Sequence, residues 1–382
     1  MALVLGIETS CDETSAAVVE GSADHATIRS LVILSQDAHA VFGGVVPEIA
    51  SRVHLTSIVP VVRRALEQAS LRPEDLDAVA VTYTPGLVGA LLVGVSYAKA
   101  LAFTLGRPLV PVHHLEGHLF AAALEHPDAV PPFTALLVSG GHTMLLDVAA
   151  WGDYRLLGAT RDDAAGEAFD KVGKLLGLPY PGGRHVEALA ASGVSGRYPF
   201  TRPMLRANQH PGDTDFYDVS FSGIKTAVLH AVRHAEAQAE QHGEQHAEPH
   251  LTQDAEGGSS NATVSRNADR EVPLQTRADI ARGFQDAVVA TLVAKTARAA
   301  RAYKRTRIVV GGGVACNQAL ASALREHAAA LGASVFTPTP RLATDNAAMI
   351  ARAGIFRLAH GDIGALDLNA YASTPLPGLR AA

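Results

Sequence analysis

The sequence predicts an α/β protein with two domains, and three observations lead to this expectation. The 382-residue chain is longer than one ordinary core requires, because domains average roughly 150 residues. Strand-like and helical stretches alternate through its first third, which is typical of a sheet covered by helices. After Pro131 and Pro132 the pattern begins again with a second hairpin. We therefore expect a first domain at 1–132, completed by the C-terminal segment 345–382, and a second domain at 133–344.

The first domain begins with a predicted β-hairpin. Residues 2–8 and 14–20 are strand-like runs that flank a tight polar turn, which is the pattern of two paired strands. Helical periodicity then extends from 48 to 69 and ends at Leu-Arg-Pro. The remaining elements expected in this half are a strand near 77–82, a helix reaching 105, a strand ending at His113 and a helix beginning at His114.

The second domain repeats this opening. A strand at 133–141 leads into a hairpin at 142–149 and 154–160, and helices follow, so the two halves resemble a duplicated unit. The further elements expected here are a helix at 164–176, a strand at 307–313 and a helix from Asn317, followed by a final helix at 345–360.

Residues 234–272 form a compositionally distinct segment, rich in Gln, His and Glu and then in Gly, Ser and Asn. Such a composition offers almost no large apolar side chains for a core, so we expect a surface insertion. Most of the net charge of −6 lies in this segment. The remainder is nearly neutral, so global charge neither supports nor excludes a nucleic-acid substrate.

Cysteine usage and hydropathy indicate a cytoplasmic protein. The two cysteines, Cys11 and Cys316, lie far apart in the sequence and imply no disulfide framework. The N-terminal residues favour a first strand over a secretory signal, because they have no basic stretch and no long apolar run. Residues 87–106 have the length of a membrane span, but Lys99, Ser96 and several glycines favour a buried helix. We expect no membrane contact.

The polar turn of the first hairpin, Gly-Ile-Glu-Thr-Ser-Cys-Asp-Glu-Thr-Ser, is the first candidate site. Backbone N–H groups and the hydroxyl of Ser10 suit a phosphate, while Asp12 and Glu13 could hold water or a cation. Taken on its own, this turn is better explained as an ordinary polar hairpin.

The sequence His114-Leu-Glu-Gly-His118 is a candidate metal site. A spacing of four places both imidazoles on one helical face, where they can bind one Zn²⁺ or Fe²⁺. Zincin peptidases also have two histidines four apart, but their general base directly follows the first histidine, whereas Glu116 stands one position later. That shift rotates Glu116 by about 100° around a helix, which argues against a peptidase.

Asp345 is a candidate third ligand, completing a two-histidine, one-carboxylate site with open positions for substrate or water. Two alternatives remain open at this point. Asp345 could instead cap the helix that follows it, and a bare His-x-x-x-His also occurs among ordinary core or surface histidines.

Three glycine-rich stretches in the second half allow close approach of a nucleotide. They lie at 137–143, 178–187 and 309–317, and none matches a Walker A or dinucleotide-binding pattern. Nearby, Asp170 could accept hydrogen bonds from a hydroxylated substrate and Lys225 could contact a phosphate. Solvated charges on helices are the alternative for both.

Taken in order, GIETSCDETS, HLEGH, LVSGGHT, GEAFDKVGKLLGLPYPGG, FSGIKT, GGGVACN and TDNAAMIA resemble the TsaD family over nearly the whole chain except 234–272. The resemblance implies two ribonuclease-H-like domains, as in the actin, Hsp70 and sugar-kinase superfamily, around a nucleotide cleft. It implies transfer of a threonylcarbamoyl group from threonylcarbamoyl-AMP to the N6 amine of the adenosine 3′ of the tRNA anticodon, releasing AMP.

The same resemblance assigns residues and partners. The implied metal ligands are His114, His118 and Asp345, with Fe²⁺ favoured over Zn²⁺. The implied substrate-binding residues are Leu137, Val138, Ser139, Gly140, Gly141, Asp170, Gly183 and Asn317. The implied cofactor and partners are an adenine nucleotide (threonylcarbamoyl-AMP, with ATP as a further candidate), tRNA, a TsaB-like paralogue and a TsaE-like ATPase.

One stretch departs from the family pattern. Where the family has Pro-Gly-Gly-Pro, an apolar pair and Asp, this chain has Pro-Gly-Gly-Arg184-His185-Val186-Glu187. Glu187 is expected to replace that Asp, and Arg184 could add a phosphate contact. The alternatives to the transferase are a metal-dependent O-sialoglycoprotein endopeptidase, an actin-like phosphotransferase and a non-catalytic scaffold.

Overall fold

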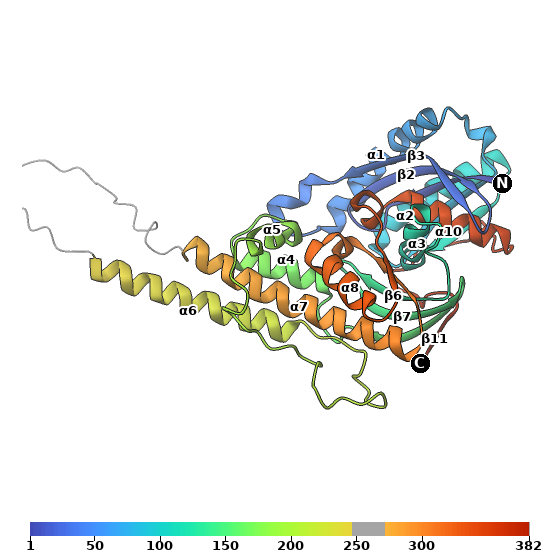
Figure 1. Cartoon of the computed structure of the whole chain (residues 1–382). Coiled ribbons are helices and arrows are strands. Elements are labelled where there is room, and N and C mark those ends of the chain that lie inside the picture. The colour runs from blue at the N-terminus through green and yellow to red at the C-terminus, as the bar shows by residue number, and fades with distance from the viewer. Residues whose placement is uncertain (247–271, 382) are drawn as a thin grey trace, which may run out of the picture.

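Two β-sheets organise the computed structural model, which describes residues 1–246 and 272–381 (Figure 1). The first sheet has the strand order β3 (Ala26–Ser35), β2 (Glu13–Gly21), β1 (Ala2–Glu8), β4 (Ala78–Thr84), β5 (Leu109–His113). The second has the order β10 (Ser334–Phe336), β9 (Arg307–Gly311), β6 (Phe133–Val138), β7 (Thr143–Ala150), β8 (Asp153–Ala159), β11 (Leu379–Ala381).

The two sheets share one topology. In the first, β1 pairs antiparallel with β2 and parallel with β4. In the second, β6 pairs antiparallel with β7 and parallel with β9. The next strands outward also correspond. β3 is antiparallel to β2 as β8 is to β7, and β5 is parallel to β4 as β10 is to β9. The duplicated unit suggested by the two hairpins is thereby confirmed.

Helices of the first half cover both faces of its sheet. The two on one face are α1 (Pro47–Ala69) and α2 (Val88–Leu105), which pack on each other and on β2 and β4. The other face is covered by α10 (Ala347–Ala359), which reaches it from the far end of the sequence. A Cβ on Gly6 would lie 2.2 Å from the Ala347 carbonyl oxygen, so only glycine lets α10 approach β1 this closely.

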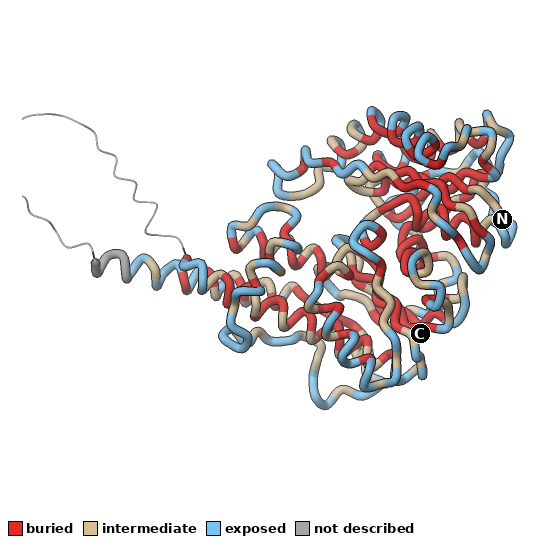
Figure 2. Tube along the Cα trace, turned by 45° about the horizontal axis from the view of Figure 1, so that its top comes forward, coloured by how far each residue is buried: buried red, intermediate tan, exposed pale blue. Residues whose placement is uncertain are grey.

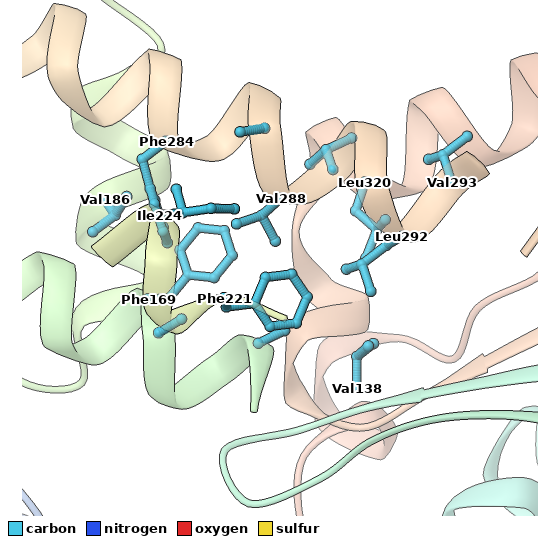
Figure 3. Packing of buried hydrophobic residues seen from close by; sticks show 14 of the residues in the cluster. Val138, Phe169, Val186, Phe221, Ile224, Phe284, Val288, Leu292, Val293 and Leu320 are labelled. Carbon is cyan, nitrogen blue, oxygen red and sulfur yellow. The ribbon is translucent and has the colours of Figure 1, made fainter. Parts of the chain in front are cut away.

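The core of the second half lies between its sheet and five helices. These are α4 (Ala165–Leu175), α5 (Gly182–Ala190), α6 (Ser222–His246), α7 (Leu274–Ala302) and α8 (Gln318–Ala329). Phe169 and Phe284 meet edge to face with ring centroids 5.0 Å apart, and Phe221 and Ile224 pack beside them (Figure 3). Buried residues follow the strands of both sheets and the inward faces of these helices (Figure 2).

The remaining described helices are short or connect the halves. They are α3 (His114–Ala121), α9 (Pro340–Ala343) and the 3₁₀ turns η1 (Asp37–Phe42), η2 (Pro73–Asp75), η3 (Ala122–Leu124) and η5 (Gly313–Cys316). Part of the predicted insertion, 234–246, belongs to α6, and 247–271 lies outside the described residues. The chain ends in β11 on the second sheet, and the domain boundaries stay a prediction.

Within the described residues, α2 is the one helix long and apolar enough to cross a membrane by length and composition. The core helix of a globular protein passes the same test. Leu91, Val95 and Ala98 of α2 are buried in the core of the first half, as the sequence analysis predicts. Its outer side carries exposed apolar residues, including Leu92.

A buried ion pair joins three elements of both halves. Glu116 of α3 is fully buried, and Arg357 of α10 binds its two carboxylate oxygens at 2.9 and 2.6 Å. The hydroxyl of Tyr154, on β8 of the second sheet, donates to the same carboxylate at 2.7 Å. Because a buried charge without partners is costly, each of these contacts fixes α3 in place.

We expect Tyr154→Phe to lower the free energy of unfolding by about 1–3 kcal/mol, because the substitution removes one hydrogen bond to a buried carboxylate at almost unchanged volume. Urea denaturation followed by circular dichroism measures the loss. Tyr97→Phe is the matched control, since the Tyr97 hydroxyl makes no hydrogen bond within the described residues. Equal stability of Tyr154→Phe and wild type would contradict the prediction.

Candidate functional site

Three side chains predicted to bind a metal converge at one point. His114 begins α3 directly after β5, His118 follows one turn later, and Asp345 lies just before α10. His114 Nε2 and His118 Nε2 are 3.4 and 3.2 Å from Asp345 Oδ1. One ligand atom from each residue lies within 4.8 Å of the others. Ligands about 2.1 Å from one ion have separations of this order, so the three fit a single metal.

Asp345 does not cap α10, which is the alternative that the sequence left open. The N-cap of α10 is Asn346, whose side chain accepts a hydrogen bond from the Met349 N–H at 3.1 Å. Asp345 therefore directs its carboxylate to the two imidazoles. Burial alone would raise the pKa of Asp345, but the charge and hydrogen bond of His114, together with His118, hold it well below its usual range.

His118 provides the test of whether these residues fit a metal. Its side chain is 1% exposed, and neither ring nitrogen has a hydrogen-bond partner within the described residues. Although Nε2 approaches Asp345, the geometry is not that of a hydrogen bond. Buried imidazole nitrogens are rarely left unsatisfied. Coordination of an ion by Nε2 would satisfy one of them, so the donor set fits a divalent metal.

Glu8 is a site residue that the sequence analysis missed. Its carboxylate, fully buried at the end of β1, accepts a hydrogen bond from His114 Nδ1 at 3.0 Å and from Thr82 Oγ1 at 2.7 Å. A carboxylate on the second ring nitrogen is the usual way to orient a metal-binding histidine. The one signal in the sequence was a charged residue directly after an apolar strand.

The polar turn after β1 lies beside this cluster. Ser10 Oγ is 3.3 Å from His114 Nδ1, so the turn and α3 meet at that histidine. Burial and the charges of Asp345 and Asp12 raise the pKa of Glu13 to about 10. Glu13 therefore lies in the negative field of Asp345 and Asp12, which a bound cation would relieve.

The same turn is held from its outer side by α1. His54, fully buried, contacts Thr14 Oγ1 through Nδ1 at 2.8 Å and the Cys11 carbonyl oxygen through Nε2 at 2.9 Å. Gln36 lies 3.3 Å from the same ring nitrogen. These contacts fix the backbone of the turn without any contact to the metal cluster itself.

The glycine turn after β6 has room for a ligand. Leu137 and Val138 are buried strand residues, so only their backbone could face a substrate. A Cβ on Gly140 or Gly141 would meet no protein atom within 4 Å. Crowding by the protein therefore does not require glycine here, whereas close approach of a ligand to the backbone would. Ser139 closes the turn by accepting from the His142 N–H at 3.1 Å.

Asp170 and Gly183 meet at the start of α5. The Asp170 carboxylate accepts a hydrogen bond from the Gly182 N–H at 2.7 Å, and burial raises its pKa while the N–H groups of Gly182 and Gly183 oppose that rise. Burial raises the pKa of Tyr180, and the charges of Asp12 and Asp170 raise it further. Asp12 of the first half and Asp170 of the second half therefore both lie close enough to Tyr180 to affect its pKa.

The side chains of two predicted substrate-binding residues form hydrogen bonds with neighbouring residues of the protein. Glu187 accepts from the Gln318 N–H at 2.6 Å. Asn317 caps α8 through the Leu320 N–H at 2.9 Å and donates to Gln285 at 3.0 Å. Both side chains therefore converge on the N-terminus of α8 and accept hydrogen bonds from N–H groups of its first turn.

Lys225 and Arg184 lie apart from the metal cluster. Lys225 forms an ion pair with Asp163 at 3.0 Å, and Lys171 binds the same carboxylate at 2.7 Å. Arg184 is exposed on α5 and donates to His185 at 3.2 Å. Glu116, which a peptidase would need beside the metal, points to Arg357 and Tyr154.

Comparison with known proteins identifies one family that this chain matches over most of its length. The family model described as "TsaD: tRNA N6-adenosine threonylcarbamoyltransferase" matches residues 27–352. A protein of that name from Gemmatimonas aurantiaca is 61% identical over 381 residues, covering 98% of both chains. Another from Moorella thermoacetica is 47% identical over 374 residues, covering 98% of this chain and 97% of the relative.

Solved structures support the fold. HypF from T. kodakarensis superposes with a TM-score of 0.56 at 15% identity, covering 96% of this chain and 48% of that one. A full-length HypF superposes with a TM-score of 0.53 at 13% identity, covering 98% of this chain and 56% of that one. At such identities the likeness shows the fold alone, and it agrees with the two ribonuclease-H-like domains predicted. With the family match, these findings show that the chain belongs to the TsaD family of tRNA N6-adenosine threonylcarbamoyltransferases.

Proposed function

We propose that this protein transfers the threonylcarbamoyl group of threonylcarbamoyl-AMP to the N6 amine of the adenosine 3′ of the tRNA anticodon and releases AMP. The observation that carries the proposal is the buried cluster of His114, His118 and Asp345 in a chain of this family. A divalent ion held there would polarise the carbamoyl carbonyl and neutralise phosphate charge. Two imidazoles and a carboxylate also leave coordination positions open, and we favour Fe²⁺ over Zn²⁺.

The protein groups around the cluster would bind and orient the substrate. The open backbone at Gly140 and Gly141, with Ser139, suits the nucleotide, and ATP is a second candidate for that place. Asp170 keeps acceptor capacity for a ribose hydroxyl beside Gly183. Asp12 and Glu13 are our candidates for the groups nearest the reacting amine.

Glu187 and Asn317 would act through α8. Glu187 joins the first turn of that helix to α5, while Asn317 caps the helix and joins it to Gln285 of α7. Lys225 would bind phosphate only by exchanging its ion pair with Asp163. Of the alternative functions, the peptidase is opposed by Glu116, whose carboxylate is occupied by Arg357.

The face formed by α1 and α2 suits a TsaB-like partner. Leu55 and Val59 of α1 and Val88 and Leu92 of α2 are exposed, each pair with a spacing of four. Because α1 and α2 pack side by side, the four make one apolar face. We propose that the TsaB-like paralogue covers this face, that a TsaE-like ATPase completes the assembly, and that the protein acts in the cytoplasm.

We expect His118→Ala to weaken Fe²⁺ and Zn²⁺ binding on the order of 100-fold and to abolish transfer, because two ligands cannot hold the ion. Elemental analysis and metal titration measure this. His118 is the preferred position, since loss of His114 would also remove a hydrogen bond to the buried carboxylate of Glu8. His327→Ala, at an exposed position on α8, is the control and should bind metal normally. Retention of metal by His118→Ala would refute the site.

The reaction itself is tested with unmodified tRNA and threonylcarbamoyl-AMP. Mass spectrometry of the digested tRNA should show threonylcarbamoyladenosine, and the small-molecule product should be AMP. In a parallel reaction supplied with ATP, formation of ADP without threonylcarbamoyladenosine would indicate a phosphotransferase. Cleavage of an added glycoprotein that depends on His118 would indicate a peptidase. Omission of the protein is the control.

We expect Leu55→Asp combined with Leu92→Asp to weaken binding to the TsaB-like paralogue at least about ten-fold, because each carboxylate would be desolvated in the interface. Size-exclusion chromatography and titration calorimetry measure the complex. Leu274→Asp, an equally apolar and exposed position on α7, should bind like wild type. Undiminished binding by the double variant would place the partner elsewhere.

A further inference from the structure

A cluster of cations and aromatic rings lies where α7 ends, on the second half. The guanidinium of Arg155, on β8, lies 5.9 Å from the ring centre of Tyr303. The guanidinium of Arg298, on α7, lies 4.8 Å from the ring centre of Phe216. Arg301 and Lys304 extend the cluster as exposed residues at and just beyond the end of α7. We name Arg155, Arg298, Arg301, Lys304, Phe216 and Tyr303 the basic–aromatic face.

The positive charge of this face is not neutralised by the carboxylates around it. Asp147, the cross-strand neighbour of Arg155, is held by Arg305 at 2.6 Å, and Asp215 is held by Arg206 at 2.9 Å. Within the described part of the chain, Arg155, Arg301 and Lys304 form no ion pair. An excess of positive charge therefore remains on a protein whose formal net charge is −6.

Underlying contacts hold the face rigid. Arg298 donates to the Phe216 carbonyl at 3.2 Å and to Gln209 at 2.7 Å. Lys295, one turn earlier on α7 and 2% exposed, donates to the carbonyls of Asp215 and Phe216, each at 2.8 Å. These bonds anchor the segment that carries Phe216 onto α7, so the rings and cations keep fixed positions without a ligand.

The face lies apart from the glycine turn after β6. On β7, Asp147 pairs with Arg155, whereas Thr143, at the start of the strand, pairs with Val138 beside the glycine turn. Four residues of strand correspond to about 13 Å. The face is therefore a different place from the glycine turn proposed for the nucleotide, and a long polyanion could contact both.

We propose that the basic–aromatic face binds the phosphate backbone of the tRNA outside its anticodon arm, while the anticodon loop occupies the metal site. The inference rests on the proposed function, which supplies a polyanionic substrate of sufficient length. Phosphate contacts by Lys and Arg position a nucleic acid without reading its sequence, and aromatic rings beside them support unstacked bases or riboses. Such a contact raises affinity for whole tRNA and leaves the chemical step unchanged.

The test compares full-length tRNA with the isolated anticodon stem-loop. In the double variant Arg301→Gln, Lys304→Gln, the dissociation constant for full-length tRNA should rise several-fold. The slope of log affinity against log salt concentration should become shallower by about 1 for each phosphate that the variant no longer binds. Affinity for the stem-loop and kcat should match wild type. Both side chains are exposed, so circular dichroism should show an unchanged fold.

Arg72→Gln combined with Arg107→Gln removes the same charge from exposed positions on the first half and is the matched control. Equal affinity of the Arg301, Lys304 variant and wild type for full-length tRNA would overturn the proposal. An equal loss of affinity for both RNAs would also overturn it, because the face would then act on the anticodon arm. Failure of the proposed function has a separate signature, since wild type would form no threonylcarbamoyladenosine whatever its tRNA affinity.

Discussion

Helix α3 is fixed between two buried carboxylates, and the candidate site depends on that constraint. Glu8 of β1 binds the ring of His114 on one side, and Glu116 of α3 itself binds Arg357 on the other. Arg357 belongs to α10, the helix that directly follows Asp345. The same ion pairs that keep two charges buried therefore set the separation of the imidazoles from the carboxylate.

Sequence periodicity predicted the histidine pair but not the groups that orient it. The spacing of His114 and His118 is local, so it follows from helix geometry alone. The partner of His114 is Glu8, which is 106 positions away, and only the register of β1 beside β4 and β5 brings them together. Asp345 was ambiguous for a related reason, because Asp and Asn both cap helices and the chain places them side by side.

The fold was predictable where the chain repeats itself. Two hairpins followed by helices indicated a duplicated unit, and the matching strand orders confirm it. The positions taken by the C-terminal residues were harder to foresee, since α10 covers the first sheet while β11 joins the second. The roles expected for Glu187 and Lys225 depended on their being open to a ligand, yet both are engaged by neighbours that no local pattern reveals.

Net charge gave no guidance about a nucleic-acid substrate, and the structure explains why. A polyanion responds to the electrostatic field of the one surface that it contacts. At the end of α7 the nearby carboxylates are neutralised by Arg305 and Arg206, and the remaining cations of the basic–aromatic face stay uncompensated. The metal cluster has the opposite character, because Asp345 and Asp12 create a negative field there that raises the pKa of Glu13. A negatively charged RNA would be repelled from such a site unless a cation occupied it, so binding of metal and binding of RNA at the cluster depend on each other.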